Sequence, residues 1–153
     1  MRKSKFRLFL YFGTVSIFFS CELKKEANPV FSAKSSQLFN ESMQLRYRNV
    51  DDMEHKVNQL DSLTKNKADA VLTEIVWLYY NQRVGNEMAL FQHATKAKEL
   101  IKGAPNDSLS YYIQAAFGNY YKNNGDYVQA LRFLYQAKQQ AVQLQSKDKE
   151  ASC

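Results

Sequence analysis

Residues that bind metals, cross-link chains or break helices are scarce in this sequence of 153 residues. Cysteine and histidine occur twice each, without the close spacing that zinc or dithiol chemistry requires. Glycine occurs five times and proline twice, so long stretches rich in Leu, Ala, Gln, Lys and Tyr are uninterrupted. Such a composition favours long helices joined by short turns. The sequence therefore predicts an all-α fold.

Motifs that carry catalysis are also missing. No Gly-rich phosphate loop, His-Glu-x-x-His pair, Gly-x-Ser-x-Gly turn or calcium loop occurs. Asp51, Asp52, Glu54 and His55 come nearest to a metal cluster, but acids at the start of a helix complement its dipole, and we favour that interpretation. His93 is isolated and is expected on the surface or paired in the interior. We expect a protein that is not an enzyme and uses no cofactor or metal.

Most of the surplus positive charge lies at the very start of the chain. Lys and Arg number 21 against 15 Asp and Glu, a net charge of +6. Four of these cations precede residue 8, so 17 remain against 15 acids if that segment is removed. A surplus of +2 is too small to attract a phosphate backbone. No nucleic-acid partner is expected.

The first 21 residues have the three-part layout of a secretory signal, with a basic start, an apolar run over 8–19 and a small residue before Cys21. This run is shorter than the roughly 20 residues that span a bilayer. Phe18-Phe19-Ser20-Cys21 resembles the lipobox of bacterial lipoprotein signals, although Phe18 stands where Leu is commonest. An uncleaved anchor is the alternative.

That resemblance implies a signal peptide over 1–20 and lipidation of Cys21. Residues 21–35 are polar and contain a proline, and they are predicted to form a tether. The expected location is the bacterial cell envelope, on the periplasmic or surface face of a membrane. Cys153 then has no partner within the chain and is expected to be a free thiol or to link two chains.

The chain repeats itself at an offset of 40 residues. Gly85 matches Gly125 and Asn86 matches Asp126. Further matches pair Tyr80 with Tyr120, Ala97 with Ala137, and Lys98 with Lys138. Two successive units of one design are therefore predicted.

The second unit resembles the tetratricopeptide repeat, a pair of antiparallel helices. Phe117-Gly118 and Tyr121 on the first helix and Ala130 on the second carry this resemblance. Gly118 would let the helices approach, Tyr121 would fill the gap between them, and Ala130 would leave room. The unit departs from the family pattern at Gln114, Leu134 and Val142. The likeness is weaker in the preceding unit, and further upstream only the apolar periodicity persists.

Capping and helix-breaking residues set the expected boundaries. Asn86 and Asp126 are predicted to begin helices, and Gly103 and Pro105 to end one. Six helices are expected near 36–47, 51–64, 67–83, 87–102, 108–123 and 127–145. Stacked as antiparallel pairs, they would form a short solenoid similar to tetratricopeptide repeats over 36–145, followed by a charged tail over 146–153.

Most aromatic rings are expected to build the core, because large rings at helical spacing inside a repeat usually do. The predicted core rings are Trp77, Tyr79, Tyr80, Tyr111, Tyr112, Tyr120 and Tyr121. The resemblance implies a concave face that binds peptides, and a solvated face is the alternative. Its predicted residues are Tyr79, Gln82, Arg83, Tyr112, Asn119, Lys122 and Asn123.

The last helix has an apolar arc of roughly 200° at about 100° per residue, too wide for one neighbour. We expect this face to pack on a second copy, on a partner protein or on the upstream helices. The leading functional hypothesis is a membrane-anchored, non-enzymatic adaptor for a peptide or protein partner. The alternative is the sensor half of a membrane-linked transcriptional regulator, truncated before its output domain.

Overall fold

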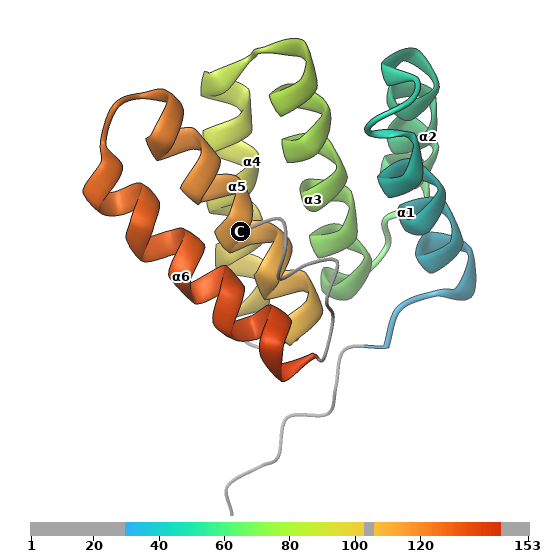
Figure 1. The fold of residues 1–153 in the computed structure, drawn as a ribbon. Helices are drawn as coiled ribbons and strands as arrows, with labels where there is room; N and C mark the ends of the chain where they lie inside the picture. Colours follow the sequence, from blue (N-terminus) through green and yellow to red (C-terminus); the bar gives the residue numbers. More distant parts are fainter. Residues whose placement is uncertain (1–29, 103–105, 145–153) are drawn as a thin grey trace, which may run out of the picture.

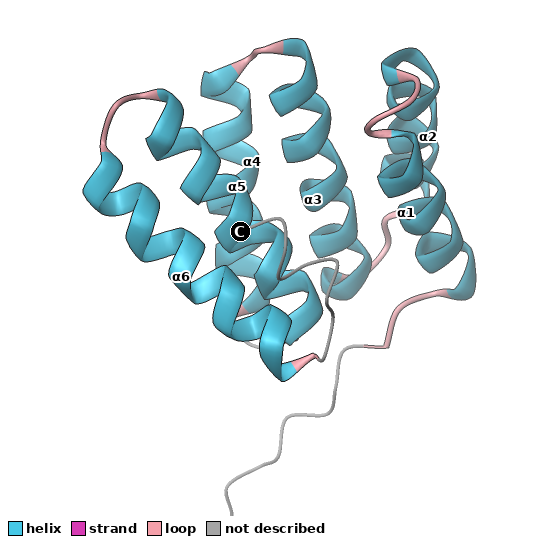
Figure 2. Cartoon of the chain, in the orientation of Figure 1, coloured by secondary structure: helices cyan, strands magenta, loops and turns pink. Residues whose placement is uncertain are grey.

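The computed structural model describes residues 30–102 and 106–144, which form six α-helices and contain no strand (Figures 1 and 2). The helices are α1 (Ala33–Leu45), α2 (Val50–Leu63), α3 (Lys67–Val84), α4 (Glu87–Ile101), α5 (Asp107–Asn123) and α6 (Tyr127–Gln143). The all-α prediction is confirmed, and the expected boundaries are correct to within three residues. None of these helices is long and apolar enough to span a bilayer. The predicted signal peptide, Cys21 and the charged tail lie outside the described residues.

Consecutive helices pack as three pairs, α1 with α2, α3 with α4 and α5 with α6 (Figure 1). Helix α3 also contacts α1, α2 and α5, and it is therefore the centre of the fold. Its side chains are buried on nearly every side, as expected for a helix surrounded by others. The largest fully buried apolar side chains come from the first three helices and α5, namely Leu38, Met53, Leu60, Ile75, Leu78 and Ile113.

Each helix begins at a residue whose side-chain oxygen accepts a hydrogen bond from a backbone N–H of the first turn. These N-caps are Ser32, Asn49, Asn66, Asn86, Asn106 and Asp126. A short polar side chain at this position satisfies one of the N–H groups that have no partner within the helix. The predicted caps at Asn86 and Asp126 are confirmed.

The turns inside the second and third pairs have the same geometry. Gly85 and Gly125 have φ angles of 75° and 78°, in the left-handed region that favours glycine. After each glycine, the next N–H donates to a carbonyl oxygen five residues earlier, at 2.9 Å in both turns. Because a shift of 40 residues also places the starts of α3 and α4 on those of α5 and α6, the predicted internal repeat is confirmed.

Helices α5 and α6 approach each other closely at Gly118. A β-carbon added at this glycine would lie 2.6 Å from the Leu134 side chain, which is nearer than any packed side chain tolerates. Ala130 is buried, and the Tyr121 ring is half-buried and stacks on Phe133 with centroids 5.5 Å apart. The predicted role of Gly118 in helix packing is confirmed.

One side of α6 is uncovered in the described part of the chain. This helix packs mainly on α5, and Phe133 on its inner side also contacts Lys98 of α4. Its outer face does not pack on the upstream helices, so that expectation is wrong. Five large apolar side chains there are more than half exposed, namely Tyr127, Val128, Leu131, Tyr135 and Val142. In the described part of the chain, α6 is the last element of the row of three hairpins, and none of the described elements covers this face (Figure 1). Packing on a second copy or on a partner protein stays a prediction.

Candidate functional site

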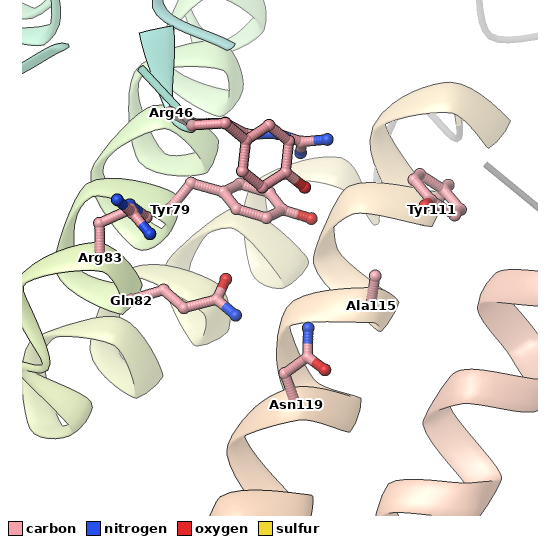
Figure 3. Close-up of a pocket in the computed structure, with 8 residues that line it drawn as sticks. Arg46, Tyr79, Gln82, Arg83, Tyr111, Ala115 and Asn119 are labelled. Atoms are coloured by element: carbon pink, nitrogen blue, oxygen red, sulfur yellow. The ribbon is translucent and has the colours of Figure 1, made fainter. Parts of the chain in front are cut away.

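A cavity of about 250 Å³ opens where the C-terminal end of α1 meets α3 and α5 (Figure 3). Its lining residues are Arg46, Tyr47, Tyr79, Gln82, Arg83, Tyr111, Ala115 and Asn119. On α5 the lining positions are spaced by four residues, so they share one face of that helix. The small side chain of Ala115, between Tyr111 and Asn119 on α5, leaves space that a larger residue would fill. None of the lining residues is acidic.

Arg46 lies at the end of α1, and its guanidinium packs over the aromatic wall that Tyr47 and Tyr79 form in the cavity. Its guanidinium carbon is 4.4 Å from the centroid of the Tyr47 ring and 5.1 Å from that of the Tyr79 ring. Both distances are within the range of cation–π attraction, which holds the guanidinium in place. Its Nε atom is buried and has no hydrogen-bond partner among the described residues. An anion in the cavity could supply that partner.

Arg83 and two amide side chains complete the polar part of the lining. Figure 3 shows Gln82 extending from α3 toward α5, where Asn119 faces the same space. Neither Arg46 nor Arg83 forms an ion pair with any carboxylate whose side chain the structure describes. The cavity therefore combines uncompensated positive charge with amide groups that can donate or accept hydrogen bonds.

Tyr79 joins the two helices that flank the cavity. Its hydroxyl donates a hydrogen bond to the backbone carbonyl oxygen of Tyr112 at 3.2 Å, and the two rings meet edge to face with centroids 5.9 Å apart. Burial raises the pKa of Tyr79 far above its ordinary value, although the nearby Arg46 opposes the shift. Burial likewise raises the pKa of Tyr112. Both phenols are therefore neutral near pH 7 and place no negative charge beside the arginines.

The structure brings together four of the seven residues predicted for the binding face, Tyr79, Gln82, Arg83 and Asn119. Tyr112 lies behind Tyr79 and packs edge to face on Phe39 of α1. Lys122 and Asn123 are exposed in the last turn of α5 and do not line this cavity. Asn123 instead lines, with Gln82, a smaller cavity of about 50 Å³.

Sequence reasoning missed the contribution of α1. Arg46 and Tyr47 follow the helix in which only apolar periodicity was recognised, so nothing marked them as part of the same face. Tyr111 was assigned to the core, and it is both buried and part of the cavity wall. The one available signal for this part of the site was Arg46 followed directly by Tyr47, a cation and an aromatic residue at a helix end.

A second cavity, of about 210 Å³, lies near the N-terminal ends of α1 and α5. Its lining residues in the described part of the chain are uncharged and include the apolar side chains of Phe31, Phe39, Leu72 and Leu109. Phe39 also contacts Tyr112, which in turn contacts Tyr79 in the wall of the first cavity. Tyr112 therefore lies between Phe39 in the wall of the second cavity and Tyr79 in the wall of the first, on the side of the fold where α1, α3 and α5 are neighbours.

The positions of the other candidate residues from the sequence are explained by structural roles. Asp51 and Asp52 are exposed in the first turn of α2, beside the Asn49 cap. His93 is half-buried, and its Nδ1 lies 2.7 Å from the carboxylate of the buried Glu74. It therefore belongs to the contact between α3 and α4, as expected for a paired interior histidine.

Comparison of the sequence with models of protein families, with curated proteins and with solved structures gave no match. Function is therefore inferred from the chain's own residues.

Proposed function

We propose that this chain is a membrane-anchored, non-enzymatic adaptor lipoprotein that binds a peptide or protein partner through helix pairs similar to tetratricopeptide repeats. The observation that carries the proposal is the cavity between α3 and α5, with two arginines that have no described acidic partner. A cleft with an aromatic wall and a few placed polar groups is typical of sites that bind and orient a ligand. Anchoring through Cys21 would hold the captured partner at a membrane of the bacterial envelope.

The repeated turns at Gly85 and Gly125 and the close approach at Gly118 support the tetratricopeptide-like part of the proposal. In a stack of such pairs, the first helix of each pair lines one side of the molecule. The cavity draws its residues from the end of α1, from α3 and from α5, which are these first helices. A partner that lies across them would contact all three pairs.

The proposal is tested by reversing charge on the predicted face. We expect Arg83→Glu with Lys122→Glu to abolish capture of the partner from native membranes without unfolding the chain, because both side chains are exposed. Lys65→Glu with Lys67→Glu is the matched control, since it changes the net charge equally at exposed positions far from the cavity. Capture is measured by crosslinking and pull-down, and folding by circular dichroism. Equal capture by both double variants would refute the assignment of the face.

A further inference from the structure

The cavity at the end of α1 and its uncharged neighbour differ in the groups they can accept. Arg46 and Arg83 give the first cavity positive charge with no acid in its lining. The described lining of the second cavity is uncharged, and four of its eight residues are apolar, namely Phe31, Phe39, Leu72 and Leu109. Both lie on the side where α1, α3 and α5 are neighbours, with Tyr112 between them. One extended ligand could therefore occupy both.

We propose that the first cavity binds a carboxylate of an acidic peptide, with Arg46 as the principal anchor, and that an apolar side chain of the same peptide enters the second cavity. This inference rests on the proposed binding function and specifies its ligand. The planar guanidinium donates paired hydrogen bonds to a carboxylate, and the buried Nε of Arg46 has no other described partner. The Tyr47 and Tyr79 rings hold the guanidinium in place, which lowers the entropic cost of binding.

The spacing between the two peptide groups follows from helix geometry. Ser36 and Phe39 line the uncharged cavity, and Arg46 lies seven to ten residues further along. A rise of 1.5 Å per residue separates the cavities by roughly 10–15 Å. An extended peptide covers that distance with about three to four residues. The expected ligand has an apolar residue about three to four positions from its carboxylate.

The ligand is tested by fluorescence anisotropy with the full chain in detergent micelles. The probe is a labelled eight-residue Gly/Ser peptide with one Leu four positions before a free C-terminal carboxylate. We expect it to bind at least about tenfold more tightly than the same peptide with an amidated end. Moving Leu next to the carboxylate, or replacing it by Gly, is expected to weaken binding. An amidated peptide ending in Asp distinguishes a side-chain carboxylate from a terminal one.

The anchor is tested by Arg46→Met, which keeps much of the side-chain length and removes the charge. We expect about tenfold or more loss of affinity for the free-acid peptide, whereas Arg48→Met, two residues away and exposed, leaves the affinity unchanged. Arg46→Lys serves if the Met variant does not fold, and it is expected to bind more weakly than the parent because the planar fork is lost. Equal binding by the Arg46 and Arg48 variants would overturn the assignment.

The proposed function and this inference fail in different ways. Equal binding of free-acid and amidated peptides, or stronger binding of a phosphoserine peptide, contradicts the carboxylate specificity even if a protein partner is captured from membranes. Tight, Arg46-dependent binding of the free-acid peptide with no captured protein supports the pocket and contradicts the adaptor role.

Discussion

The hydroxyl of Tyr79 on α3 lies 3.2 Å from the backbone carbonyl oxygen of Tyr112 on α5 and donates a hydrogen bond to it. This bond links residues 33 positions apart, across the boundary between two helix pairs. It fixes the aromatic wall against which the Arg46 guanidinium packs. This contact between two first helices therefore helps to shape the cavity wall.

Tyr79→Phe removes this hydrogen bond and keeps the ring. We expect the free energy of unfolding to fall by about 1 kcal/mol, the usual net value of one buried hydrogen bond. Urea denaturation measures it. Tyr135→Phe is the control, because that residue is exposed on α6, and a change within about 0.5 kcal/mol is expected there. Similar losses in both variants would argue against a special role for the Tyr79 hydroxyl.

Gly118→Ala is expected to destabilise the chain although alanine is the better helix former. The new methyl group would lie 2.6 Å from the Leu134 side chain, and such overpacking costs about 1–3 kcal/mol. An isolated helix would instead gain up to about 1 kcal/mol from this change. Thermal or urea unfolding shows whether the substitution lowers or raises the free energy of unfolding.

A double-mutant cycle with Leu134→Ala isolates the cause of that loss. Removing the Leu134 side chain takes away the two side-chain atoms nearest to the added methyl group. The cost of Gly118→Ala should then largely vanish. A loss that is the same in both backgrounds would show that close helix approach is not the reason for glycine at this position.

Glu74 makes stability depend on pH in the acidic range. Its buried carboxylate lies 2.7 Å from His93 Nδ1 and 2.6 Å from Lys96 Nζ on α4. Burial raises the pKa of Glu74, but the hydrogen bonds to His93 and Lys96 outweigh burial and lower it below the ordinary 4.5. The stabilisation is therefore present above about pH 4.5 and is lost as pH falls through the lower pKa of the folded state.

We expect Glu74→Gln to lower the unfolding free energy at pH 7 and to flatten its decline below pH 4.5. Glu99→Gln, at an exposed position on α4, is the control and should keep the parental pH profile. Urea unfolding between pH 3 and pH 7 provides the comparison. A Glu74 variant with an unchanged profile would place the acid-sensitive group elsewhere.

Cys21 is predicted to carry the lipid that anchors the chain. Each buried methylene contributes about 0.8 kcal/mol, so several acyl chains would hold the protein at a membrane. Metabolic labelling with an alkyne fatty acid should mark the parent and Cys153→Ser, but not Cys21→Ser. Membrane fractionation should follow the same pattern. Labelling that survives Cys21→Ser would contradict the lipobox assignment.

The helices could be predicted because their ends are coded locally, by Asn86 and Asp126 at helix starts and by Gly85 and Gly125 at the turns. The cavity could be predicted only in part. Gln82, Arg83 and Asn119 follow from helical spacing, which fixes the face on which a side chain lies.

The contribution of α1 required tertiary structure. Arg46 joins the site because the end of α1 packs beside α3, a contact between segments with no shared motif. Tyr79 was assigned both to the core and to the binding face, and it serves as both, because a buried ring can still form the wall of a cavity. Lys122 lies one turn beyond Asn119, where the cavity has already ended.

Photo-crosslinking from position 82 in native membranes shows whether a partner occupies the cavity between α3 and α5. A photoreactive amino acid replaces Gln82 in the cavity wall, and the same replacement at the exposed Gln92 on α4 is the reference. We expect a discrete crosslinked partner from position 82, lost in the Arg46→Met background, and none from position 92. Crosslinks of equal yield from both positions, or none from position 82 while the partner is still captured, would contradict this expectation.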